Sequence, residues 1–285
     1  RKFNKNQSID GINLIIWGLF KKVVIADNLA FLTNDIFNNY SNYHGGHLIL
    51  GAIYFSFQIY CDFSGYSDIA IGTAKLLGFE LMSNFKFPYF SKNISEFWKN
   101  WHISLSTWFR DYLYIPLGGS RRGNFKHFKN LFIVFFLSAL WHGANYTFLF
   151  WGLSHFILYL ISGLFKIFHS RIKLNYVKNR IKDFISGFMT FLMVSFAWIF
   201  FRSETIEKSL DYIYIMVTKI QFPVSNRIGL AFIISLLFLE FFIKKNERKI
   251  EFSKNNSFNY LIISTLSFLI ISNSVNHSEF IYFKF

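Results

Sequence analysis

The chain has 285 residues, of which 53% are hydrophobic, 22% aromatic and only 16% charged, and its net charge is +14. Because an average soluble domain is about 25% charged, this chain has too little polar surface to cover a water-soluble globule. The same composition excludes intrinsic disorder and low-complexity chains. The basic residues gather between long apolar runs, which is typical of a membrane protein and argues against nucleic-acid binding.

The first apolar stretch is residues 12–29, whose spacing predicts a helix. Two consecutive lysines, Lys21 and Lys22, interrupt its apolar face. Since charged side chains are costly in the hydrocarbon core, we expect this helix to lie at the membrane interface and not to span the bilayer.

A second apolar run, residues 47–60, leads into a polar sequence, CDFSGYSD. We expect this polar sequence to form a turn, with Asp62 and Asp68 at the turn or at a helix start. Cys61 is the only cysteine, which excludes an intrachain disulfide and a multi-cysteine zinc site, so we expect it to pack in a helix.

The segment 83–125 differs in kind, since it mixes aromatic residues with charges and contains Pro88 and Pro116. Aromatic and apolar residues recur at spacings of three and four, which predicts one helix with a broad aromatic face beginning at Ser95 as its N-cap. Such a helix lies in the headgroup region or packs re-entrantly inside the protein. The residues of the aromatic face are Phe97, Trp98, Trp101, Leu105, Trp108 and Phe109.

The rest of the chain contains further apolar runs that predict membrane helices. Two of them form a pair broken by a Gly-Ala-Asn sequence after His142. In another run, we expect Glu240 and Lys244 to form an i,i+4 ion pair at the membrane interface. Basic clusters at 121–129, 166–182 and 244–254 place those segments in the cytoplasm, and 203–227 and the tail outside. The predicted runs are residues 131–141, 146–165, 184–201, 228–243 and 258–272.

Two histidines, His102 and His142, each follow a tryptophan directly. A lone histidine on an apolar helix is more often a packing residue, but His142 meets a backbone break where irregular chain needs a cavity. Burial would keep its imidazole neutral, as a general base requires. We expect His155 to serve packing, and His44 and His47 to lie on the surface.

Three sequence segments resemble those of a known family: CDFSGYSDIAIG, FWKNWHISLSTWFRDYLYIPLGG and LWHGANYTFLFWGLSH. They resemble the membrane-bound O-acyltransferase family, and more narrowly its bacterial branch that O-acetylates alginate or peptidoglycan or D-alanylates teichoic acid. The likeness covers most of residues 50–160. No hydrolase elbow, Walker loop or metalloprotease motif is present.

The resemblance implies an all-α, polytopic transmembrane bundle with amphipathic or re-entrant helices around a central tunnel, in the bacterial cytoplasmic membrane. Residues 1–285 would be one membrane domain, the C-terminal portion of a longer protein. His142 would be the catalytic residue and His102 a second residue associated with activity. The candidate substrate-binding residues, which lie in the same motifs, are Trp141, Asn145, Arg110 and Asp111.

The reaction implied is acyl transfer from a cytoplasmic thioester, with acetyl-coenzyme A as donor substrate, to hydroxyls of an extracytoplasmic polysaccharide. An extracytoplasmic acyltransferase partner, no tightly bound cofactor and no metal are expected. His102 or Asn145 would polarise the thioester carbonyl or orient His142, and Arg121 and Arg122 would attract the donor's phosphates. The alternatives are D-alanyl transfer to teichoic acid, a transporter or channel with His142 as gate or proton relay, and a membrane partner that relays material to a separate enzyme.

Overall fold

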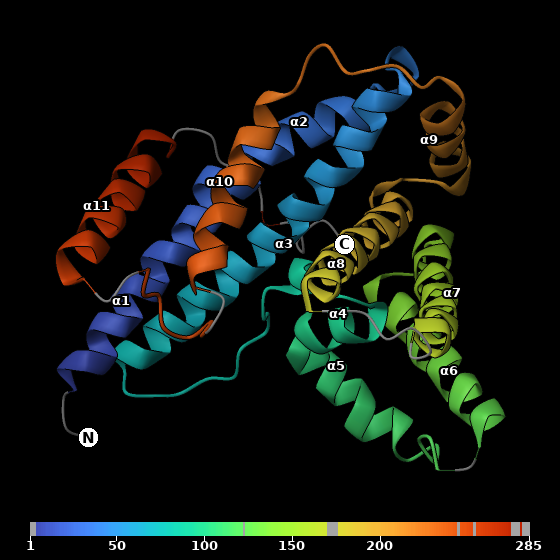
Figure 1. Ribbon diagram of the computed structural model, residues 1–285, viewed down its shortest axis with the longest axis horizontal. Coiled ribbons are helices and arrows are strands. Elements are labelled where there is room, and N and C mark those ends of the chain that lie inside the picture. The colour runs from blue at the N-terminus through green and yellow to red at the C-terminus, as the bar shows by residue number, and fades with distance from the viewer. Residues whose placement is uncertain are drawn as a thin grey trace. The chain divides into compact units, whose positions relative to one another are not determined.

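The fold is all-helical, as the sequence predicted, with no strand in the part of the chain that the structure describes (Figure 1). A computed structural model describes residues 4–121, 123–169, 176–243, 246–252, 255–274 and 280, with the backbone alone within 164–169 and 176–180. The α-helices are α1 (Lys5–Leu19), α2 (Asp27–Asn38), α3 (Gly45–Leu76), α4 (Ile94–Asn100), α5 (Ile103–Phe109), α6 (Asn124–His142), α7 (Tyr146–His169), α8 (Tyr176–Arg202), α9 (Ile206–Thr218), α10 (Ile228–Ile243) and α11 (Asn256–Ser272). Shorter segments are the π-helices η1 (Phe20–Ala26) and η4 (Arg110–Tyr114) and the 3₁₀ turns η2 (Tyr40–Asn42) and η3 (Pro88–Phe90).

The chain folds into two compact units. The first comprises the residues up to Lys86 and those from Tyr214 onward, and the second is Phe87–Ile213. One membrane domain over residues 1–285 stays a prediction.

The first unit is built around α3. Helices α1 and α2 and the intervening η1 all pack against it, α10 contacts η1 and α2, and α11 contacts α1 and η1 (Figure 1). Glycines allow α1 and α3 to approach closely: a Cβ on Gly18 would lie 2.6 Å from the carbonyl oxygen of Gly65, and one on Gly65 would lie 2.7 Å from that of Gly18. The backbones therefore touch where these glycines face each other.

The polar turn predicted at CDFSGYSD is wrong, because this sequence lies inside the unbroken helix α3. Its aspartates pair with the lysines of η1: Asp62 is buried, and the side chain of Asp68 is 16% exposed. Lys21 Nζ lies 2.7 Å from Asp68 Oδ2, and Lys22 Nζ lies 2.7 Å from Asp62 Oδ1 and 2.8 Å from Asp27 Oδ1. The chain stays helical at the two lysines but widens into a π-helix there, and Lys21 is buried. That the helix over 12–29 lies at the membrane interface stays a prediction. Ion pairing in the interior satisfies charges that lipid could not.

Two further polar residues of the first unit are more buried than expected. Glu240 on α10 is 1% exposed and accepts a 2.6 Å hydrogen bond from Tyr60 Oη. Lys244, its expected partner, lies outside the described residues. His47 is buried with Nε2 3.1 Å from Ser225 Oγ, which corrects its predicted surface position. Cys61 is buried in α3, as predicted.

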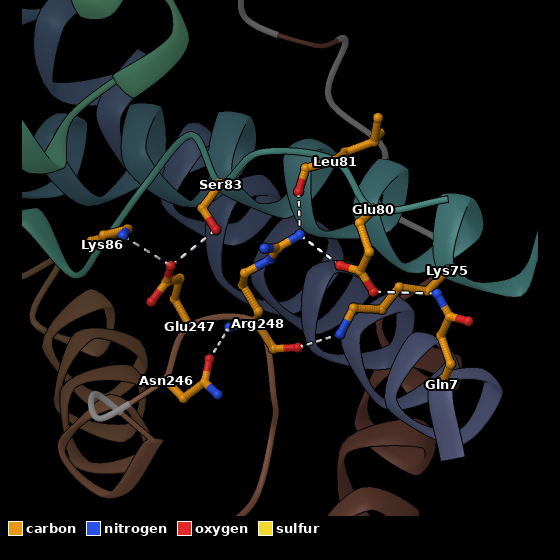
Figure 2. A network of polar contacts seen from close by, with 9 residues as sticks. All are labelled: Gln7, Lys75, Glu80, Leu81, Ser83, Lys86, Asn246, Glu247 and Arg248. Carbon is orange, nitrogen blue, oxygen red and sulfur yellow. Dashed lines mark hydrogen bonds and ion pairs between the residues drawn. The ribbon is translucent and has the colours of Figure 1, made fainter. Parts of the chain in front are cut away.

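A polar network joins the loop after α3 to the loop after α10 (Figure 2). Arg248 donates to Glu80 Oε2 at 2.7 Å and to the Leu81 carbonyl, and its own carbonyl accepts from Lys75 Nζ at 2.7 Å. Ser83 Oγ donates to the neighbouring Glu247 at 3.0 Å. Part of the basic charge in segment 244–254 is therefore neutralised by carboxylates of the protein itself.

The second unit holds α6 and α7 side by side, with α8 packed on α7 and the short helices α4 and α5 nearby (Figure 1). The single aromatic helix predicted here is wrong: the chain forms α4 and α5 with a break at Trp101–His102. The N-cap of α4 is Asn93, whose Oδ1 accepts from the Glu96 amide at 2.9 Å, and not Ser95.

Among the described helices, three are long and apolar enough to cross a membrane: α3, residues Tyr146–Gly163 of α7 and residues Ile181–Arg202 of α8. Helices α10 and α11 are apolar but shorter, with 16 and 17 residues. The runs 146–165 and 184–201 are thus confirmed as candidate membrane spans. The run 131–141 lies in α6, which is not among the helices that are both long and apolar enough to cross a membrane. The sidedness assigned from the basic clusters stays a prediction.

Candidate functional site

His142 is the last residue of α6, at the break that the sequence indicated. The chain turns at Gly143, whose φ of 151° suits glycine, and α7 begins three residues later. Asn145 fixes this connection: its Oδ1 accepts from the Thr147 amide at 3.1 Å, and its Nδ2 donates to the Glu204 carbonyl at 2.9 Å. The break is therefore an ordered loop tied to the start of the α8–α9 connection.

Aromatic rings from three helices surround the His142 imidazole. Trp151 of α7 and Phe201 of α8 each place a ring centroid 5.1 Å from it, at interplanar angles of 87° and 80°. Trp141 adds a third ring at 4.8 Å. His142 is 9% exposed as a result.

His102 occupies the break between α4 and α5. Its φ of 42° is in the left-handed region, which is uncommon for a residue with a side chain and interrupts the helix that the aromatic spacing predicted. It is also 9% exposed, and its Nδ1 lies 3.4 Å from Ser104 Oγ. Its ring lies 6.1 Å from Trp141 at 71°.

Trp141 is thus in edge-to-face contact with both histidines, and the structure brings His102, Trp141 and His142 together. Unlike its neighbours, Trp141 is 54% exposed. A half-open indole between two buried imidazoles is a surface on which a planar group or a sugar ring could stack.

Burial sets the protonation state of both histidines. Desolvation lowers the pKa of His102 to about 4, and desolvation together with the nearby His102 lowers the pKa of His142 to about 3. At neutral pH both imidazoles are therefore uncharged, and each offers a nitrogen lone pair. A neutral imidazole can accept a proton from a hydroxyl.

The other candidate binding residues are placed differently. Arg110 and Asp111 form a bidentate ion pair with each other, Nε to Oδ1 at 2.7 Å and Nη2 to Oδ2 at 3.1 Å, and both side chains are exposed. Asn145 is exposed and engaged in the loop as described. Their roles in substrate binding stay predictions. Arg122 lies outside the described residues.

His155 was expected to pack in the core, and it is fully buried on α7. It lies among five aromatic side chains, and sequence reasoning missed that one of them, Trp151, also contacts His142. Trp151 and His155 are one helical turn apart on an apolar helix, and this spacing could have indicated that the two rings touch. The five rings belong to Phe97, Trp98, Phe135, Trp151 and Trp198.

No group of three or more His, Cys, Asp or Glu side chains is arranged to hold a metal ion within the described ranges. The side chains that the structure brings around His102 and His142 are indoles, a phenyl ring and the Ser104 hydroxyl.

Comparison with known proteins matches the model of the membrane-bound O-acyltransferase family to residues 5–206, a range that contains both histidines. The chain is 43% identical over 208 residues to "Probable alginate O-acetylase AlgI" of Pseudomonas putida, covering 72% of this chain and 41% of that protein. It is 38% identical over 207 residues to "Peptidoglycan O-acetyltransferase" of Helicobacter pylori, covering 73% and 38%. It is 30% identical over 204 residues to "Teichoic acid D-alanyltransferase" of Bacillus subtilis, covering 68% and 51%. The match therefore spans about half or less of the length of these relatives.

Proposed function

The chain belongs to the membrane-bound O-acyltransferase family, and from this premise we propose that the whole protein moves an acyl group from a thioester to hydroxyls of a cell-surface polysaccharide. The observation that carries the proposal is the pair of buried histidines, His102 and His142, on either side of the half-exposed Trp141. Neutral bases beside an open aromatic surface suit proton abstraction from a hydroxyl of a bound sugar.

In the proposed reaction, His142 takes the proton of the acceptor hydroxyl as its oxygen attacks the thioester carbonyl carbon. The carbon–sulfur bond then breaks, and the departing thiolate recovers the proton from the imidazolium, so that an ester and a free thiol result. General-base assistance of this kind contributes about 10²–10⁴-fold. His102 faces the same tryptophan and orients the reacting groups or polarises the carbonyl.

The acyl group in this proposal is acetyl, supplied by acetyl-coenzyme A on the cytoplasmic side, and the acceptor lies outside the bacterial cytoplasmic membrane. Two of the relatives support acetyl, since at 43% and 38% identity they are named for O-acetylation of alginate and of peptidoglycan. D-alanyl transfer is the second candidate, supported by the teichoic acid D-alanyltransferase at 30% identity. A separate extracytoplasmic acyltransferase would act as partner.

The experiment is a transfer assay on the full-length protein in sealed vesicles. Radiolabelled acetyl-coenzyme A is supplied on one side and a soluble polysaccharide on the other, and label released from the polysaccharide by mild alkali is counted as ester. We expect donor-dependent labelling of the polysaccharide. If solute crosses the vesicle membrane but no ester forms on the polysaccharide, the result would contradict acyl transfer and favour the transporter alternative.

A further inference from the structure

His155 lies in a box of aromatic rings in the second unit. Its imidazole is 0% exposed and nearly parallel to two phenyl rings, Phe97 at 6.3 Å and 5° and Phe135 at 6.3 Å and 12°. Trp98 and Trp151 meet it at centroid distances of 4.9 and 5.2 Å, at angles of 78° and 74°. Packing therefore fixes the position of the ring on all sides.

Neither Nδ1 nor Nε2 of His155 has a hydrogen-bond partner among the described residues. Burying a polar group without a partner costs free energy, and a phenylalanine of similar outline would fill the same box without that cost. Stability alone thus does not account for an imidazole at this position.

Trp151 links this ring to the site. It follows His142 across the helix break and precedes His155 by one turn of α7, and it is itself buried. The indole meets the His155 imidazole at 74° and the His142 imidazole at 87°, with centroid distances of 5.2 and 5.1 Å. Two imidazoles therefore contact one indole, and the orientation of that indole affects both.

We propose that His155 is a positioning residue, which holds the Trp151 indole in the orientation that keeps the His142 imidazole in place. This proposal rests on the acyl transfer proposed above. The physical basis is the polarity of the ring: a neutral imidazole presents an N–H dipole to the neighbouring indoles, and an aromatic ring attracts N–H groups at its face. A phenyl ring offers only C–H groups, so it would fill the box but orient the indole less strongly.

The test compares His155→Phe with wild type in the full-length protein. We expect a melting temperature at or above that of wild type, because the unpartnered nitrogens are gone, together with a fall in kcat of about 10-fold or more and an unchanged KM, since small displacements of a catalytic group are costly. Wild-type kcat, or a loss of kcat matched by a loss of folded protein, would overturn the proposal.

A matched control is Phe156→Leu, because Phe156 is the next residue of α7 and its ring lies against Phe132 at 5.4 Å. This variant should keep wild-type kcat. In a Trp151→Phe background, His155→Phe should lower kcat less than about 2-fold, because the intermediary is already altered. Additive effects of the two substitutions would overturn the route through Trp151.

A readout that needs no transfer activity separates this proposal from the proposed function. Diethyl pyrocarbonate modifies imidazole nitrogen, and the rate at His142 can be followed by mass spectrometry of the peptide that contains it. We expect that rate to rise severalfold in His155→Phe and to stay unchanged in Phe156→Leu. An unchanged rate in His155→Phe would overturn the positioning role even if wild type transfers no acyl group, which would itself count against the proposed function.

Discussion

Lys22 offers a sharp test of how the first unit tolerates buried charge. Its ammonium lies 2.7 Å from Asp62 Oδ1 and 2.8 Å from Asp27 Oδ1, and both carboxylates are almost fully buried. At an effective dielectric constant of about 20, each contact attracts by about 6 kcal/mol. The desolvation of each ion, several kcal/mol, offsets most of this attraction, so the intact cluster contributes little net stability.

Removing only the lysine is a different matter, because it leaves two carboxylates buried without their cation. We expect Lys22→Met to lower the free energy of unfolding by about 3–5 kcal/mol. Adding Asp27→Asn and Asp62→Asn to Lys22→Met should recover most of the loss, since the remaining groups are neutral. Thermal and denaturant unfolding of the purified full-length protein measures both effects.

A matched control is Lys208→Met, because Lys208 of α9 pairs with Glu204 in the connection just before that helix, and both side chains are exposed. This change should cost less than about 1 kcal/mol. The reasoning would be refuted by a Lys22→Met protein within about 1 kcal/mol of wild type, or by a triple variant no more stable than Lys22→Met alone.

Two further predictions concern pH and close helix packing. Burial holds the pKa of His102 at about 4, below the 6.5 of an unfolded histidine, so the unfolded chain binds more protons between these values. The contribution of neutral His102 to stability is present above pH 6.5, and about 3 kcal/mol of it is lost as the pH falls toward 4. The melting temperature of wild type should therefore fall more steeply over this pH range than that of His102→Gln. An equal fall in the two proteins would contradict the lowered pKa of His102. Gly18→Ala places a Cβ 2.6 Å from the Gly65 carbonyl oxygen and should lower the free energy of unfolding by denaturant by about 1–3 kcal/mol. The control is Gly163→Ala, whose Cβ would have no heavy atom within 4 Å and should not lower it. Equal stability of the two variants would contradict the close approach of α1 to α3.

The apolar runs and breaker residues of the sequence were sufficient to predict some of the helices and one of their breaks. The run 228–243 matches α10 to the residue, and the break after His142 was evident from glycine and asparagine between two apolar runs. These features are local, because hydrophobic spacing and breaker residues act within a few turns of chain.

The buried charges were not predictable in this way. The sequence CDFSGYSD is typical of a turn, yet it stays helical because lysines some forty residues earlier supply the counter-charges for Asp62 and Asp68. Likewise, the local pattern indicated Lys244 as a partner of Glu240 but gave no sign of the hydrogen bond that Tyr60 donates to this carboxylate. Such pairings depend on which helices meet, and a single sequence does not contain that information in its local pattern.

The roles of the candidate site residues stay predictions, but the surroundings that the structure gives them can be compared with the sequence. The motif resemblance singled out His102 and His142, and the structure places both against Trp141. The aromatic spacing of three and four continues across Trp101 and His102, so it gave no sign of the left-handed break there. The contacts of His142 with Trp151 and Phe201 arise from the packing of α6, α7 and α8 and required the structure.

The most direct test of the central claim is the rate of ester formation by His142→Ala in the full-length protein. The control is His44→Ala, which alters an exposed histidine of the first unit. At equal abundance in the membrane and equal melting temperature, we expect His142→Ala to lose at least about 10²-fold in transfer while His44→Ala keeps wild-type activity. Transfer at the wild-type rate by a folded His142→Ala protein would contradict the role of His142 as the base.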